Sequence, residues 1–131
     1  MEKINSLTGM LDLISSRSDK EDLANKIFST EGVLKEIFKN FSLSEIRNPA
    51  LESTSLFKRS VGDTSDIVNK ELYTFLDKNE KSISLRPEGT ASVIRSIIEN
   101  KLDAELQKLW YIGPMWRYER PQKGRFRQFY Q

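Results

Sequence analysis

The chain has 131 residues, of which 37% are apolar and 31% charged, and its formal net charge is +2. This composition suits one folded domain with a modest core, and we expect neither a membrane span nor a secretory signal. Cysteine and histidine are both absent, which excludes disulfides, thiolate or imidazole catalysis, and metal sites built on those ligands.

The N-terminal third is predicted to contain a long helix over residues 19–41. Ser18 and Glu21 fit a capping box ahead of its first turn. Its apolar stripe, which we expect to pack inward, consists of Leu23, Ile27, Leu34, Ile37, Phe38 and Phe41. A short strand over 44–48 follows, and Pro49 ends it because proline has no N–H to donate to a ladder.

A second, shorter helix is predicted over residues 53–60. Leu56 and Phe57 would form its inward face. Residues 62–69 are polar and are expected to form a loop before the next strand.

A hairpin and a third helix are predicted next. Residues 72–76 have high β-propensity, 77–81 are turn-like and 83–86 form the return strand. Pro87 ends that strand and suits the start of a helix over 89–100. The buried face of this helix is predicted to be Ala91, Ile94, Ile97 and Ile98.

The C-terminal part is predicted to form three strands, over 108–112, 115–120 and 126–131. Gly113 and Pro114 would break the first strand, and a loop over 121–125 would follow the second. A helix followed by mostly antiparallel strands with helices between them predicts an α+β fold.

Positive charge and aromatic residues concentrate in residues 107–131. This stretch has a charge balance of +5, against −3 for residues 1–106, and contains 7 of the 13 aromatic residues. Its basic residues are Lys108, Arg117, Arg120, Lys123, Arg125 and Arg127. Such a mixture suits a polyanion such as phosphate or RNA, and it equally suits a solvated hairpin with arginines on its outer face.

One cluster with chemical potential lies at the predicted strand-to-helix junction, where Glu88, Gly89 and Thr90 follow Pro87. A carboxylate and a hydroxyl two residues apart could hold an ammonium group. The alternative is that Glu88 and Thr90 cap the helix, which contributes about 1 kcal/mol.

A second cluster is the basic loop with the Arg117-x-Glu119 pair, which we expect on one face of a strand. A planar guanidinium can bridge two anionic oxygens, and this suits the attack of a carboxylate on a phosphate. The alternative is a salt-bridged hairpin, whose ion pairs contribute little stability.

Together these segments closely resemble the N-terminal catalytic region of the histidyl-tRNA synthetases, a family of class II aminoacyl-tRNA synthetases. The matching stretches are 4–14, 44–49, 56–66, 71–75, 85–91 and 109–131. The resemblance implies a class II synthetase-like antiparallel sheet flanked by helices. Residues 1–131 would carry motifs 1 and 2 of the catalytic domain. Motif 3 and the anticodon-binding domain would be absent from these residues, so the sequence is expected to be truncated.

The resemblance also implies residue roles. Motif 1, from the 19–41 helix to Pro49, would build a homodimer interface. Motif 2, over 109–131, would bind ATP and the acceptor end of the tRNA. The catalytic Arg117 would contact the ATP α-phosphate and the histidine carboxylate. Glu119 would face the adenine and Arg125 the outer phosphates or the acceptor stem. The α-ammonium of histidine would be held at Glu88, Gly89, Thr90 and Gln131, and Tyr130 replaces a histidine that the family usually has.

The implied function is that of a cytoplasmic histidine–tRNA ligase, which joins histidine to tRNA(His) with ATP and Mg²⁺. No Mg²⁺ ligand is recognisable in the chain. Activation needs charge neutralisation and positioning more than proton transfer, so the missing histidine and cysteine are no obstacle. We expect the 131 residues alone to be inactive.

Two alternatives remain at this point. The chain could belong to a synthetase-like regulatory subunit of histidine biosynthesis without ligase activity, or it could be a general RNA-binding hairpin module. The Glu88-Gly89-Thr90 cluster and the Arg117-x-Glu119 pair favour the ligase, because a regulator has no need for ATP contacts.

Overall fold

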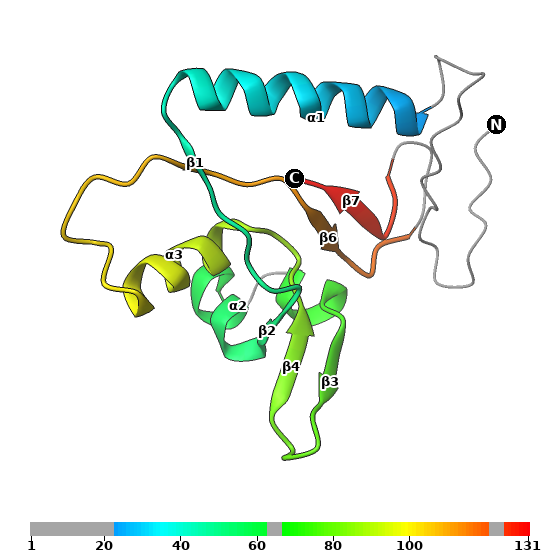
Figure 1. The fold of residues 1–131 in the computed structure, drawn as a ribbon. Helices are drawn as coiled ribbons and strands as arrows, with labels where there is room; N and C mark the ends of the chain where they lie inside the picture. The colour runs from blue at the N-terminus through cyan, green and yellow to red at the C-terminus, as the bar shows by residue number, and fades with distance from the viewer. Residues whose placement is uncertain (1–22, 63–66, 121–124) are drawn as a thin grey trace.

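The computed structural model of the protein describes residues 23–62, 67–120 and 125–131 (Figure 1). The predicted capping box of Ser18 and Glu21 lies outside these residues. The elements are α1 (Leu23–Asn40), β1 (Ser44–Glu45), β2 (Leu51–Ser53), α2 (Thr54–Val61), the π-helical turn η1 (Ile67–Glu71), β3 (Thr74–Leu76), β4 (Ser82–Leu85), α3 (Thr90–Glu99), β5 (Leu109–Trp110), β6 (Pro114–Trp116) and β7 (Gln128–Tyr130).

The described strands form three small sheets. β2, β4 and β3 make an antiparallel sheet in that order, and β6 and β7 make an antiparallel hairpin. β1 pairs in parallel with β5, so β5 lies beside the segment that follows α1. Figure 1 shows α1 along one side of the molecule and α2 and α3 beside the β2-β4-β3 sheet. The α+β prediction is confirmed.

The predicted β3–β4 hairpin is confirmed, and its turn is organised by one carboxylate. Oδ1 of Asp77 accepts hydrogen bonds from the backbone N–H groups of Asn79 (2.8 Å) and Lys81 (2.9 Å). Glu80 completes the turn with a positive φ of 60°. Aspartate is favoured in such turns because its side chain can bond the backbone a few residues ahead.

The predicted break between the first two C-terminal strands is confirmed at residues 111–113, but Pro114 itself begins β6 and is not part of the break. The backbone groups of Gly113 and Gln131 exchange two hydrogen bonds of 3.1 Å. Pro114 and Tyr130 form the next pair of the ladder, and residues of this pair do not hydrogen-bond to each other. Antiparallel ladders alternate in this way, and a proline at a non-bonded position breaks nothing. β6 and β7 are also shorter than predicted, and β2 was not predicted at all.

The buried face of α3 differs from the predicted one. Ala91 is buried as expected, but Ile94 and Ile98 are 51% and 61% exposed. Arg95 instead faces the sheet, where its Nε and Nη2 lie 3.1 and 2.7 Å from Oε1 of the buried Glu52. This ion pair orients α3, because turning the isoleucines inward would separate the two charges.

The apolar stripe of α1 is only partly covered. The centroid of the Phe38 ring lies 5.0 Å from that of Trp110 in β5, and this contact joins the helix to the β1-β5 sheet. Ile37 and Phe41, predicted to pack inward, are exposed, Phe41 by 71%. Residues of this helix therefore leave an apolar surface open within the described chain.

The core of the described residues is small and centres on two side chains. Phe57 of α2, as predicted, and Met115 of β6 are both fully buried. No helix among the described residues has the length and apolar character needed to cross a membrane. Pro87, in the segment that joins β4 to α3, is also among the fully buried residues.

Candidate functional site

The segment between β4 and α3 is built around the carboxylate of Glu88. Its Oε2 accepts from the backbone N–H of Thr90 (2.6 Å) and its Oε1 from that of Ala91 (3.0 Å). Glu88 thus caps α3, as one of the two sequence interpretations predicted. Thr90 does not cap: its exposed hydroxyl lies 3.5 Å from the hydroxyl of Tyr111.

Gly89 is packed so closely against Tyr111 that a larger residue would force the ring to move. Its N–H donates to Oε1 of Gln131 (3.1 Å), which joins two predicted site residues 42 positions apart. A Cβ at this position would lie 2.6 Å from Cζ of Tyr111. The glycine therefore allows the backbone of the segment to lie directly against the Tyr111 ring.

Arg117 reaches across from the end of β6 to the same segment. Its Nε donates to the carbonyl oxygen of Pro87 (2.9 Å), and its guanidinium lies over the ring of Phe129, 5.1 Å from the centroid. The side chain is 26% exposed. Arg117 is thus held beside Glu88, Gly89 and Thr90, and its Nη1 lies 4.0 Å from the Glu119 carboxylate.

Glu119 lies between two guanidinium groups. Its carboxylate is 2.8 Å from Nε of Arg125 and 4.0 Å from Nη1 of Arg117, and the side chain is only 13% exposed. Arg117 and Glu119 were predicted to share a face through strand alternation, but β6 ends at Trp116. A tight turn brings them together instead, because the Glu119 N–H donates to the Arg117 carbonyl (2.8 Å).

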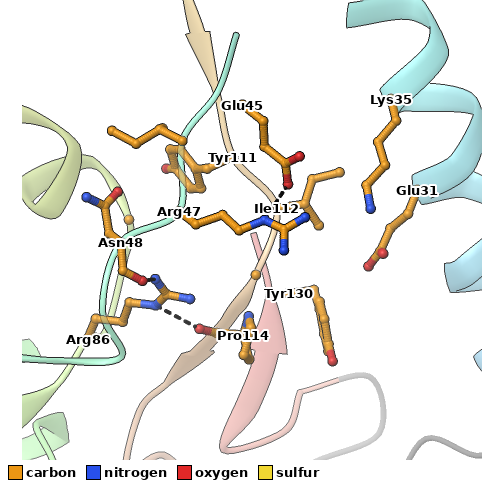
Figure 2. A pocket seen from close by; sticks show the side chains of 13 residues that line it. Glu31, Lys35, Glu45, Arg47, Asn48, Arg86, Tyr111, Ile112, Pro114 and Tyr130 are labelled. Atoms are coloured by element: carbon orange, nitrogen blue, oxygen red, sulfur yellow. Dashed lines mark hydrogen bonds and ion pairs between the residues drawn. The ribbon is translucent and has the colours of Figure 1, made fainter.

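Sequence reasoning missed Arg86 and Tyr111, which line a cavity of about 360 Å³ between α1 and the strands. Figure 2 shows Arg86 bonded to the backbone at Asn48 and Pro114, while Arg47 pairs with Glu45 closer to α1. A charged residue directly ahead of Pro87 was the one available signal for Arg86. Tyr111 had none, because its contact with Gly89 exists only in the folded chain.

None of three cavities that described residues line is lined by all of the predicted site residues. Glu88 and Thr90 line a groove of about 850 Å³ between α2 and α3, whereas Gln131 lines a hollow of about 350 Å³ against α1. Arg117, Glu119 and Arg125 line neither of these spaces. In the part of the chain described by the structure, no three acidic side chains cluster as a metal site would require.

Comparison with known proteins decides the family. Residues 20–131 match the family model described as histidyl-tRNA synthetase. This chain belongs to the histidyl-tRNA synthetase family. The resemblance predicted from its motifs is thereby confirmed.

The histidyl-tRNA synthetase relatives are much longer than this chain. A histidine–tRNA ligase of Geobacter sulfurreducens is 59% identical over 103 residues, which are 77% of this chain and 25% of the relative. A histidine–tRNA ligase of Prochlorococcus marinus is 50% identical over 132 residues, covering 100% of this chain and 29% of the relative. The chain therefore spans less than a third of the curated relatives it matches.

Solved structures confirm the synthetase-like fold. Apo histidyl-tRNA synthetase of S. aureus has a TM-score of 0.67 at 38% identity, covering 93% of this chain and 30% of that chain. An ATP phosphoribosyltransferase regulatory subunit/histidyl-tRNA synthetase of Bacillus halodurans C has a TM-score of 0.69 at 22% identity. At that identity the second likeness concerns the fold alone.

Proposed function

We propose that this chain contributes motifs 1 and 2 to a cytoplasmic histidine–tRNA ligase, which activates histidine with ATP and transfers it to tRNA(His). The observation that carries the proposal is the position of Arg117, held at Pro87 beside Glu88, Gly89 and Thr90. Motif 3 and the anticodon-binding domain would correspond to parts of the relatives that this chain does not span.

The proposed chemistry is the attack of the histidine carboxylate on the α-phosphorus of ATP. Both groups are anionic, so a fixed positive charge between them lowers the barrier. With Nε bound to the Pro87 carbonyl, the Nη nitrogens of Arg117 would bridge the carboxylate and the phosphate, and Nη1 would exchange its 4.0 Å contact with Glu119 for one of them. The positive charge that the described residues would supply at this step is that of the Arg117 guanidinium.

The α-ammonium of histidine would be held where α3 begins. A carboxylate has about four acceptor positions, and Glu88 uses two of them on backbone N–H groups. Capping the helix and accepting from an ammonium group are therefore compatible. Gln131, fixed by its bond from Gly89, would approach the same group from the β7 side.

The neighbours of Arg117 are proposed to hold the rest of the nucleotide and the tRNA. Glu119, shielded between two guanidinium groups, would face the adenine. Arg125 is 65% exposed, so it can exchange its bond with Glu119 for a phosphate of ATP or of the acceptor stem. The regulatory-subunit alternative gains no support from the likeness at 22% identity, which concerns the fold alone.

A segment exchange tests the proposed ligase function. In the S. aureus synthetase, the part that matches this chain would be replaced by residues 1–131. We expect this chimera to catalyse histidine-dependent pyrophosphate exchange, and the 131 residues alone to show none. A folded chimera without exchange activity would contradict the proposed function, and turnover by the isolated chain would contradict its expected inactivity.

The open face of α1 supports a homodimer through motif 1. Its exposed apolar residues are Phe28, Val33, Ile37 and Phe41. Val33, Ile37 and Phe41 follow one another at four-residue spacing and share one face, and an exposed apolar face of this kind is typical of association sites. We propose that a second copy covers it.

Replacing Ile37 by aspartate should weaken the association of two copies, because a charge would be buried without a partner. Sedimentation equilibrium is expected to show a monomer for Ile37→Asp and a dimer for the unmodified chain. Leu106→Asp, which changes an exposed leucine on another segment, is the control and should leave the dimer intact. Equal masses for Ile37→Asp and the unmodified chain would exclude this interface.

A further inference from the structure

Arg86 forms hydrogen bonds with several segments of the chain. Its backbone N–H donates to the Ala50 carbonyl (2.9 Å), and its own carbonyl accepts from the N–H of Trp116 (3.0 Å). Its side chain donates from Nε to the Pro114 carbonyl (3.1 Å) and from Nη1 to the Asn48 carbonyl (2.7 Å). One residue thus connects the segment after β1, the end of β4 and strand β6 (Figure 2).

The side chains of Arg86 and Arg117 connect the same two segments, the end of β4 and strand β6, in opposite directions. The side chain of Arg86, at the end of β4, bonds the carbonyl of Pro114 in β6. The side chain of Arg117, just after β6, bonds the carbonyl of Pro87 just after β4. The bond from the Trp116 N–H to the Arg86 carbonyl lies between the two crossings. The distance from Arg117 to the start of α3 is therefore set from both sides.

The surroundings of Arg86 are arranged for a guanidinium in particular. Its two described side-chain partners are backbone carbonyls, and burial lowers its pKa from the ordinary arginine value, against smaller opposing effects of Glu52 and Tyr111. A Cβ on Gly113 would lie 2.7 Å from Nη2 of Arg86, so a larger residue there would displace the end of the guanidinium. A lysine has one ammonium group and cannot reproduce this two-pronged geometry.

We propose that Arg86 is a positioning residue that holds β6 in register with the start of α3 and so places the Arg117 guanidinium for nucleotide binding. This inference rests on the role of Arg117 under the proposed function. Arg86 itself acts only through Arg117. When Arg117 turns toward a phosphate, the crossing made by Arg86 keeps the two segments together.

A double-mutant cycle on ATP affinity tests this coupling in the 131-residue chain. Arg86→Gln should weaken ATP binding by at least about tenfold, because a misplaced binding group loses much of its effect. In an Arg117→Ala background, Arg86→Gln should cause no further loss. Arg47→Gln, at a largely exposed arginine of the same cavity, is the control and should bind ATP normally. Independent, additive losses would overturn the proposal.

Amide hydrogen exchange gives a second readout that needs no nucleotide. Arg86→Gln and Arg86→Lys should both speed exchange at the N–H groups of Trp116 and Arg117, while Arg47→Gln should not. Unchanged protection in the Arg86 variants would overturn the positioning role even if ATP binding fell. If the unmodified chain bound no ATP, the role of Arg117 in nucleotide binding would fail instead, and hydrogen exchange would still decide whether Arg86 holds β6.

Discussion

Arg117→Ala is expected to lower histidine-dependent pyrophosphate exchange in the chimera by roughly 100- to 1,000-fold, or ~2.7–4 kcal/mol of transition-state stabilisation. The residue is the one predicted to neutralise the carboxylate and the α-phosphate at the same time. Its side chain is three-quarters shielded from solvent and held by Pro87 and Phe129, so no neighbouring arginine can take its place without rearrangement. Steady-state exchange rates over a range of ATP and histidine concentrations would measure the loss.

The matched control for Arg117→Ala is Arg47→Ala. Arg47 is also an arginine, but it is 78% exposed and pairs only with Glu45 among the described residues. It should retain near-normal exchange activity, and both variants should melt within a few degrees of the unmodified protein. If Arg117→Ala kept activity within about threefold of normal, less than 1 kcal/mol, the catalytic role of Arg117 would be lost.

Phe57→Ala is expected to destabilise the chain by about 3–5 kcal/mol, because it leaves a cavity where a fully buried ring packed. A domain of this size is stable by only about 5–15 kcal/mol, so the variant should be partly unfolded at moderate temperature. Urea titration followed by tryptophan fluorescence would measure the difference in unfolding free energy.

Leu76→Ala serves as the control for Phe57→Ala, since Leu76 is also a large apolar residue but is 66% exposed. Its substitution should change stability by about 0.5 kcal/mol or less. Similar losses for both variants would mean that Phe57 does not centre the core of this region. A change in the slope of the unfolding free energy against urea concentration, with the midpoint unchanged, would indicate an altered unfolded state instead.

Local patterns were sufficient where a signal lies within a few residues. Asp77 predicted the β3–β4 turn, because its carboxylate bonds backbone groups two and four positions ahead. Phe57 was expected to face inward and does, since its helix has one apolar side. Glu88, Gly89, Thr90 and Arg117 were recognised as candidates because their residue types match a known family.

Local patterns failed where a distant partner decides the outcome. Ile94 and Ile98 have the spacing of a buried face, yet Glu52 turns α3 so that Arg95 faces the sheet. Pro114 was expected to lie in the break between two strands, yet Gln131 pairs with Gly113 and Pro114 begins β6 at a position that needs no hydrogen bond. Neither Glu52 nor Gln131 can be connected to these positions by periodicity.

The amino-acid sequence by itself determined the family, the α+β class and the residue types available for chemistry, because these follow from composition, spacing and motifs. Only the tertiary structure decided that Gly89 bonds Gln131, that Arg117 is held at Pro87, and that Arg86 binds the two segments from the opposite side. The physical reason is that hydrogen bonds and ion pairs act over a few ångströms in space, and folding brings together groups that lie 28 to 42 positions apart along the chain.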